Sequence, residues 1–218
     1  MARRFDLVVG NGAYAHAGAL PNPRNDATAI AEVLKELDFK VALGTDLRIQ
    51  EMEDVLNRFE GDIYESDTAL FFFAGHGIQV KGQNYLIPVD AEIKQEIHLR
   101  RRTFSLTEIL GTMEQNAKNT LIFLDACRDN PFTRSYLAHV GNEERARSLV
   151  RSGLAGITLE ANRSSFIAYA TSPDTVAFDG TGLHSPFTEG LLAHIRTPNI
   201  SISDMMIESS QKRLERNK

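Results

Sequence analysis

The chain has 218 residues, of which 42% are hydrophobic and 24% charged, and its formal net charge is −5. This composition excludes a disordered chain, and a chain of this length buries roughly 70% of its unfolded surface. The acidic balance argues against nucleic-acid binding, because no excess of basic side chains exists to displace counterions from phosphates.

The sequence also lacks the signals of membrane insertion and secretion. It contains no run of about 18 apolar residues that would span a bilayer. The first six residues lead directly into a strand-like segment, without the apolar stretch and cleavage site of a signal peptide. For a chain that is not cut from a longer precursor, we therefore expect a cytoplasmic location and no membrane association.

Short apolar runs alternate along the chain with segments of helical period. The expected strands cover residues 5–10, 39–43, 68–74, 120–125 and 165–170, and the expected helices cover residues 25–37, 49–59, 105–115 and 185–195. Several strands are continuously apolar, which is typical of strands covered on both faces. The alternation predicts an α/β fold in one domain over residues 1–218, with a mostly parallel central sheet of about six strands sandwiched between helices.

Three segments depart from this alternation. Residues 77–88 contain a turn signal between two short extended pieces, which predicts a small antiparallel excursion. Residues 131–162 are polar and rich in Arg and Glu, and we interpret them as a long connection with one exposed helix near residues 142–150. Residues 201–218 begin as an amphipathic helix.

Polar residues follow two of the strongest strands at the point where each strand ends. Residues 68–74 run into Gly75-His76-Gly77, and residues 120–124 run into Asp125-Ala126-Cys127. In an open parallel sheet, ligands bind at the carboxyl ends of the strands. If these strands are neighbours about 4.8 Å apart, His76 and Cys127 lie within about 7 Å of each other.

Cys127 is the only cysteine of the chain, so it forms neither an internal disulfide nor a multi-cysteine zinc site. It is either a small buried hydrophobe or a reactive thiol, and its position opposite a histidine favours the thiol. An imidazole beside a thiol promotes thiolate formation and later protonates a leaving amine. The backbone N–H groups of Gly77 and Cys127 would then stabilise an oxyanion. The alternative for Gly75-His76-Gly77 is a turn with an exposed histidine.

These motifs resemble the caspase-like peptidase family, in particular its bacterial paracaspase or orthocaspase branch. Caspases carry their nucleophile between Ala and Arg with a histidine about 50 residues upstream, and here His76 precedes Ala126-Cys127-Arg128 by 51 residues. Further similar motifs, in order along the chain, are Val8-Val9-Gly10-Asn11, Leu20-Pro21-Asn22-Pro23-Arg24-Asn25-Asp26-Ala27, Asn84-Tyr85-Leu86-Ile87-Pro88-Val89-Asp90 and Ala168-Tyr169-Ala170-Thr171. The resemblance implies the caspase–haemoglobinase fold, a Cys127–His76 dyad and cysteine-type endopeptidase activity.

The resemblance also implies a division of the domain. A large-subunit-like part would cover residues 1–130, a connecting segment 131–162 and a small-subunit-like part 163–218, with further sequence after the C-terminus in relatives. An Arg-directed protease would be able to cut itself in the 131–163 connection, which holds or adjoins Arg134, Arg145, Arg147, Arg151 and Arg163. The alternative for that stretch is a solvated charged helix. Relatives dimerise through an edge strand, but no patch in this sequence identifies such a homodimer interface.

Three acidic residues predict the substrate. Asp125 lies two residues before Cys127, on the same face of the strand, and the resemblance places Asp26 and Asp179 in the same substrate-binding pocket. Converging carboxylates repel each other unless a cation arrives, so we expect cleavage after Arg, and after Lys less well, because guanidinium pairs with carboxylates through two hydrogen bonds. Taken singly, Asp26 would cap a helix and Asp179 would belong to an Asp-Gly turn.

Other functions fit the sequence less well. Residues 10–15 match a dinucleotide-binding G-x-G-x-x-A pattern, but no helix is expected to begin at these glycines. The histidines show no metal-binding spacing and no EF-hand loop is present, so we expect no cofactor and no calcium dependence, as in paracaspases and unlike many metacaspases. A non-catalytic caspase-fold interaction or signalling domain, and an amidase on a similar sheet, remain the alternatives.

Overall fold

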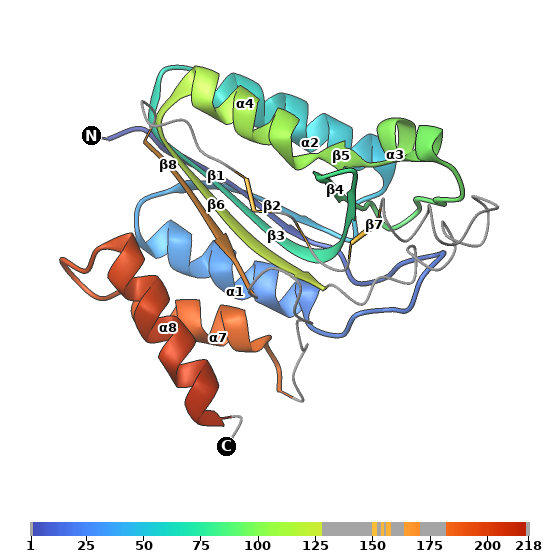
Figure 1. Cartoon of the computed structure of the whole chain (residues 1–218). Coiled ribbons are helices and arrows are strands. Elements are labelled where there is room, and N and C mark those ends of the chain that lie inside the picture. The colour runs from blue at the N-terminus through green and yellow to red at the C-terminus, as the bar shows by residue number, and fades with distance from the viewer. Residues whose placement is uncertain are drawn as a thin grey trace.

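The computed structural model describes residues 2–127, 150–151, 154, 156–157, 164–170 and 182–216. Its centre is a parallel sheet with the strand order β2-β1-β3-β6-β8 (Figure 1). The strands are β1 (Arg4–Gly10), β2 (Lys40–Thr45), β3 (Ser66–Val80), β6 (Ala117–Cys127) and β8 (Ser164–Tyr169). The predicted α/β fold with a mostly parallel sheet is therefore confirmed.

An antiparallel extension continues the sheet beyond β3. Strand β4 (Gln83–Leu86) pairs with the last part of β3 and with β5 (Phe104–Ser105), and β7 (Val150–Arg151) pairs with Gln79 and Val80. Lys81 and Gly82, both with positive φ, make the turn between β3 and β4. The antiparallel excursion expected at residues 77–88 is present, whereas Val150, expected at the end of a helix, begins a strand. The rest of the helix expected near residues 142–150 lies outside the described residues.

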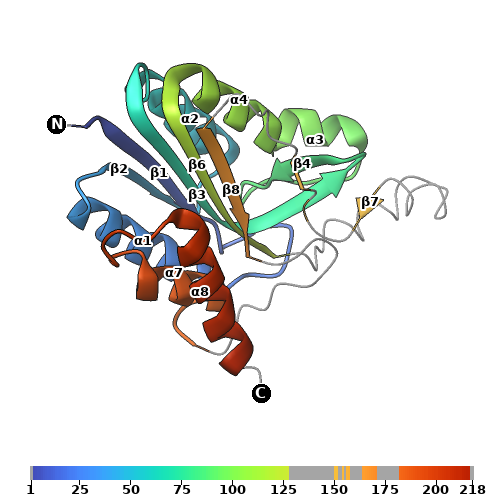
Figure 2. The ribbon, with the colours of Figure 1, turned by 60° about the vertical axis from the view of Figure 1, so that its left-hand side comes forward.

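Helices cover both faces of the sheet (Figures 1 and 2). One face carries α2 (Ile49–Asp62) and α4 (Leu106–Asn116), with α3 (Glu96–Arg102) beside the antiparallel extension. The other face carries α1 (Pro23–Glu36), α7 (Pro186–His194) and α8 (Ile202–Arg216). The sequence predicted all of these helices except α3. None of the described helices is long and apolar enough to cross a membrane.

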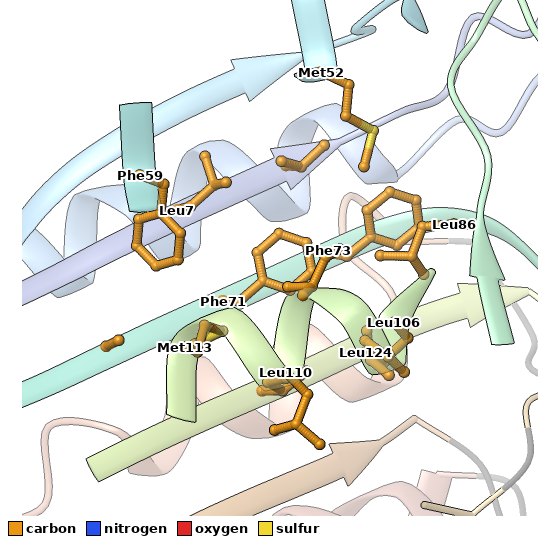
Figure 3. Close-up of a cluster of buried hydrophobic side chains, with 14 of the residues drawn as sticks. Leu7, Met52, Phe59, Phe71, Phe73, Leu86, Leu106, Leu110, Met113 and Leu124 are labelled. Carbon is orange, nitrogen blue, oxygen red and sulfur yellow. The ribbon is translucent and has the colours of Figure 1, made fainter. Parts of the chain in front are cut away.

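Three consecutive phenylalanines of β3 explain how the sheet holds both helical layers. Successive side chains of a strand point to opposite faces. Phe71 and Phe73 therefore pack with the residues of α2 and α4, as Figure 3 shows, while Phe72 packs with the residues of α1 and α7. All three side chains are fully buried. Strand β3 is thus the rigid centre of the domain, and its end is a fixed point for a site.

Strand β3 does not end at residue 74, as the sequence suggested, but continues to Val80. Gly75-His76-Gly77 therefore lies within a strand and not in a turn. The reason is a change of neighbour: pairing with β1 stops at Ala74, and pairing with β4 starts at Gly77. His76 therefore lies between the part of β3 that pairs with β1 and the part that pairs with β4.

Candidate active site

His76 and Cys127 face each other across two neighbouring strands. The parallel register of β3 and β6 pairs Ala74 with Asp125, Gly75 with Ala126 and His76 with Cys127. Adjacent strands lie about 4.8 Å apart, so this register places the two residues side by side at the end of the sheet. The backbone of Cys127 is described, and the chain from residue 128 to 149 lies outside the described residues.

The backbone and ring of His76 are held by Tyr14. The His76 N–H donates to Tyr14 Oη at 2.7 Å, and Tyr14 Oη in turn donates to the Ile87 carbonyl at 3.2 Å. The two rings pack with their centroids 4.4 Å apart. His76 is only 3% exposed, so its position is set by protein contacts and not by solvent.

The contact of His76 with Gly18 assigns the imidazole tautomer. His76 Nε2 lies 3.1 Å from the Gly18 carbonyl oxygen. A carbonyl oxygen only accepts, so Nε2 carries the proton of this hydrogen bond, and in the neutral ring the lone pair lies on Nδ1. Nδ1 is therefore the atom of His76 that is able to take a proton from a thiol.

The loop after β1 supplies both Tyr14 and Gly18. Its start is fixed because the N–H groups of Gly12 and Ala13 donate to Asp46 Oδ1 at 2.8 and 2.9 Å. Helix α1 begins only at Pro23 and not at the glycines themselves, as dinucleotide binding requires. Gly10 packs directly against this helix, because a Cβ atom added to Gly10 would lie 2.2 Å from the Pro23 carbonyl oxygen, so no space for a pyrophosphate exists between them. The loop that resembles a nucleotide fingerprint instead positions the histidine.

Asp125 and Asp26 meet at the N-terminus of α7. Ser185 Oγ and Thr188 Oγ1 both donate to Asp125 Oδ2, the second at 3.1 Å. The Ser185 N–H donates to both carboxylate oxygens of Asp26, at 3.2 and 3.4 Å. Asp26 is 1% exposed and Asp125 9% exposed. Two of the three predicted pocket acids are thus brought together on one residue, Ser185.

Helix α7 is a suitable partner for two carboxylates. Ser185 is its N-cap, since Ser185 Oγ accepts from the Thr188 N–H at 3.0 Å. The N-terminus of a helix carries partial positive charge and favours nearby anions. Asp26 also contacts His184, whose Nδ1 lies 2.9 Å from Asp26 Oδ1. Asp26 does not cap its own helix, because the N-cap of α1 is Asn22.

Gly77 and Asp179 are the other two predicted site residues. Gly77 lies in β3 opposite Leu86, and a Cβ atom added to Gly77 would come within 3.0 Å of Leu154. A methyl group at this position would require the Leu154 side chain to move by a few tenths of an ångström. Asp179 lies outside the described residues. Within the described ranges, no group of three or more His, Cys, Asp and Glu residues has the arrangement of a metal site.

The sequence analysis missed the residues that hold these groups in place. Tyr14 and Gly18 contact His76, and His184, Ser185 and Thr188 contact the two acids. Ser185 carried a signal only as a helix start, and Tyr14 only as part of a rejected nucleotide pattern. A local sequence pattern does not predict contacts between residues that are far apart in the chain, and Asp125 and Ser185 are 60 residues apart.

Comparison with known proteins identifies a matching family and two relatives of the chain. A family model for the caspase domain matches residues 3–218. Over 123 residues, or 56% of the chain, the sequence is 29% identical to human mucosa-associated lymphoid tissue lymphoma translocation protein 1 and 29% identical to its Mus musculus homolog. The match spans only 15% and 14% of the length of these two relatives.

A solved structure shares the fold. The crystal structure of protein GSU0716 from Geobacter sulfurreducens superposes with a TM-score of 0.67, covering 96% of this chain and 89% of that chain. The two sequences are 15% identical. At this level of identity the likeness shows the common fold alone.

Proposed function

The chain belongs to the caspase-domain family, and from this premise we propose that it is a cysteine endopeptidase that cleaves after Arg, and after Lys less well, through a Cys127–His76 dyad. The observation that carries the proposal is the register of β3 and β6, which pairs His76 with Cys127 at the carboxyl end of the sheet. The placement of the chain in the bacterial paracaspase or orthocaspase branch stays a prediction.

In the proposed reaction, His76 Nδ1 takes the proton of the Cys127 thiol and the thiolate attacks the carbonyl carbon of the scissile peptide bond. The carbonyl oxygen becomes an oxyanion that accepts hydrogen bonds from the N–H groups of Gly77 and Cys127. The imidazolium then donates its proton to the leaving amine as the C–N bond breaks, which leaves a thioester. Water, deprotonated by His76, hydrolyses the thioester and restores the thiol.

Arg specificity in this proposal rests on Asp26, Asp125 and Asp179. The contacts of Asp26 and Asp125 support it, because Ser185 donates a hydrogen bond to each carboxylate and so brings the two acids to one place, where a single guanidinium would meet both. The planar guanidinium offers paired donors to carboxylates, which an ammonium group does not. Asp179, which lies outside the described residues, would complete the pocket in this proposal.

We further propose that the enzyme needs neither metal nor organic cofactor and that it cuts its own 131–163 connection after an arginine. Calcium independence is tested by adding a chelator to the activity assay. Self-cleavage is tested by mass spectrometry of purified wild type and Cys127→Ala. Identical fragments in both preparations would exclude cleavage by this thiol.

The central experiment measures hydrolysis of peptide-aminomethylcoumarin substrates that differ only in Arg, Lys, Asp or citrulline before the scissile bond. We expect the rate order Arg, Lys, and then the uncharged and acidic residues, with turnover lost in Cys127→Ala and in His76→Ala. Preference for Asp would refute the pocket but not the dyad. No turnover under reducing conditions, with and without calcium, would identify a non-catalytic interaction domain instead.

A further inference from the structure

A groove runs between helices α2 and α4, on one face of the sheet and away from the strand ends that carry His76 and Cys127. Its cavity has a volume of about 260 Å³. Side chains of both helices and of Phe104 line it, with Phe59 and Met113 buried at the bottom and Leu56 half-buried at the side (Figure 3 labels Phe59 and Met113). The groove is therefore apolar at its floor.

The rim of the groove is acidic. Glu53 and Glu60 of α2 and Glu108 of α4 line it, whereas no Lys or Arg among the described residues does. The two helices contain five and two carboxylates respectively, against the single Arg58. Their balance of −6 accounts for the whole net charge of −5 of the chain. The three arginines Arg100, Arg101 and Arg102 belong to α3 and do not line the cavity.

Charge and size together select the occupant. An acidic rim repels nucleic acid and anionic membrane surfaces, since both are polyanions. A cavity of about 260 Å³ lies below the 300 to 1,000 Å³ range of small-molecule pockets, so it suits one or two apolar side chains and not a cofactor. Amphipathic helices commonly bind with their apolar face in an apolar groove of this kind.

We propose that this groove binds a basic amphipathic helix of a partner protein. Large apolar side chains of that helix enter the cavity between Leu56, Phe59 and Met113. Lys or Arg residues beside them pair with the rim carboxylates. Glu53 and Glu60 lie seven residues, or about 10.5 Å, apart along α2, which matches basic residues two turns apart on the partner helix. The site is separate from the proposed peptidase pocket.

The test uses the Cys127→Ala variant, so that the probe stays intact. The probe is a fluorescein-labelled 18-residue helical peptide with Leu and Phe on one face and Lys on the other, and the matched peptide has Glu in place of every Lys. Fluorescence anisotropy measures binding, and hydrogen exchange locates it. We expect micromolar binding of the Lys peptide that weakens with salt, at least roughly tenfold weaker binding of the Glu peptide, and protection confined to α2 and α4.

Two charge reversals on exposed helical glutamates sharpen the test. Glu60 lies on the rim of the groove, and Glu32 lies on α1, on the opposite face of the sheet. The two variants are Glu60→Lys and Glu32→Lys. Both change the net charge equally. We expect Glu60→Lys to weaken binding of the Lys peptide roughly threefold to tenfold and Glu32→Lys by less than about twofold. Circular dichroism confirms that both variants fold.

Several outcomes would overturn the proposal. They are equal affinity for the two peptides, equal effects of the two reversals, absence of saturable binding up to 1 mM, and protection at the ends of β3 and β6 in place of α2 and α4. The last result would mean that the Lys peptide occupies the peptidase pocket. Asp125→Asn in the same background separates these sites, because it leaves binding to the groove unchanged.

Discussion

The hydroxyl of Ser185 donates a hydrogen bond to Oδ2 of Asp125 and so joins the N-cap of helix α7 to the carboxyl end of a central strand. The N–H of the same serine donates to Asp26. Both residues of each pair are buried, so these contacts are shielded from solvent. The orientation of the two acids therefore depends on the N-terminus of α7, although α7 carries none of the predicted pocket residues.

Removal of the serine hydroxyl tests this dependence. Ser185→Ala loses the N-cap of α7 and one donor to Asp125, and we expect a loss of about 1 to 2 kcal/mol in the free energy of unfolding. For a domain of this size, each kcal/mol lowers Tm by roughly 2 to 4 °C. We also expect a higher KM for Arg substrates. Ser185→Thr keeps the hydroxyl and is the control; an unchanged Tm and KM in Ser185→Ala would refute the dependence.

Asp125 is the carboxylate closest in sequence to the proposed nucleophile, and its charge is tested by Asp125→Asn. Removing one partner of a buried charge pair costs about 2 to 5 kcal/mol, which corresponds to a fall of roughly 30-fold to several thousandfold in kcat/KM for Arg substrates. A citrulline substrate lacks the positive charge and should lose little. Asp62→Asn, at an exposed carboxylate of α2, is the control for net charge. An equal loss of kcat/KM for the Arg and citrulline substrates would show that Asp125 does not recognise the positive charge of the substrate.

The Tyr14 hydroxyl connects the backbone N–H of His76 to the carbonyl of Ile87, the residue after β4. Tyr14→Phe leaves the buried His76 N–H without its acceptor, and an unsatisfied buried donor costs about 1 to 3 kcal/mol. Because the ring of Phe still packs on His76, we expect kcat to fall more than KM rises. Tyr64→Phe, at a tyrosine that is 60% exposed, should change neither parameter. Equal kinetics of the two variants would mean that the hydroxyl does not position His76.

The parts of the site that lie on regular strands could be predicted from the sequence. Apolar runs fix the strands, and period-two alternation and the edge of the sheet then place His76 beside Cys127. The supporting contacts could not be predicted, because they depend on an irregular loop and on a helix end that meet the strands only in the folded chain. Tyr14 is 62 residues from His76, and its hydrogen bond follows from the path of the loop.

The backbone of Gly75 gives a sharper test of the same contact. Its φ is +154°, and a Cβ atom built there would lie 2.6 Å from Tyr14 Oη. Gly75→Ala must therefore displace Tyr14, and with it the support of His76. We expect a loss of at least about 1 kcal/mol of stability and a large loss of kcat. Gly111→Ala, in α4 with open space around the position, should stabilise the protein slightly.

Asp6 is a buried acid that the proposed mechanism does not use. It lies in β1 between Val41 and Leu70 of the neighbouring strands, is 1% exposed, and has no hydrogen-bond partner for either carboxylate oxygen in the part of the chain that the structure describes. Burial raises the pKa of Asp6 well above its ordinary value of 3.8. The folded protein therefore keeps this side chain protonated at a pH where the unfolded chain has ionised it.

The sign of the pH effect follows from proton binding. Above about pH 4 the unfolded chain releases the Asp6 proton and the folded protein retains it, so the contribution of Asp6 to stability falls as pH rises, until the raised folded pKa is passed. Asp6→Asn has no such titration. We expect the stability of Asp6→Asn relative to wild type, measured by urea unfolding, to increase by up to about 1.4 kcal/mol per pH unit above pH 4. A difference that is constant from pH 4 to 8 would show that Asp6 titrates alike in both states.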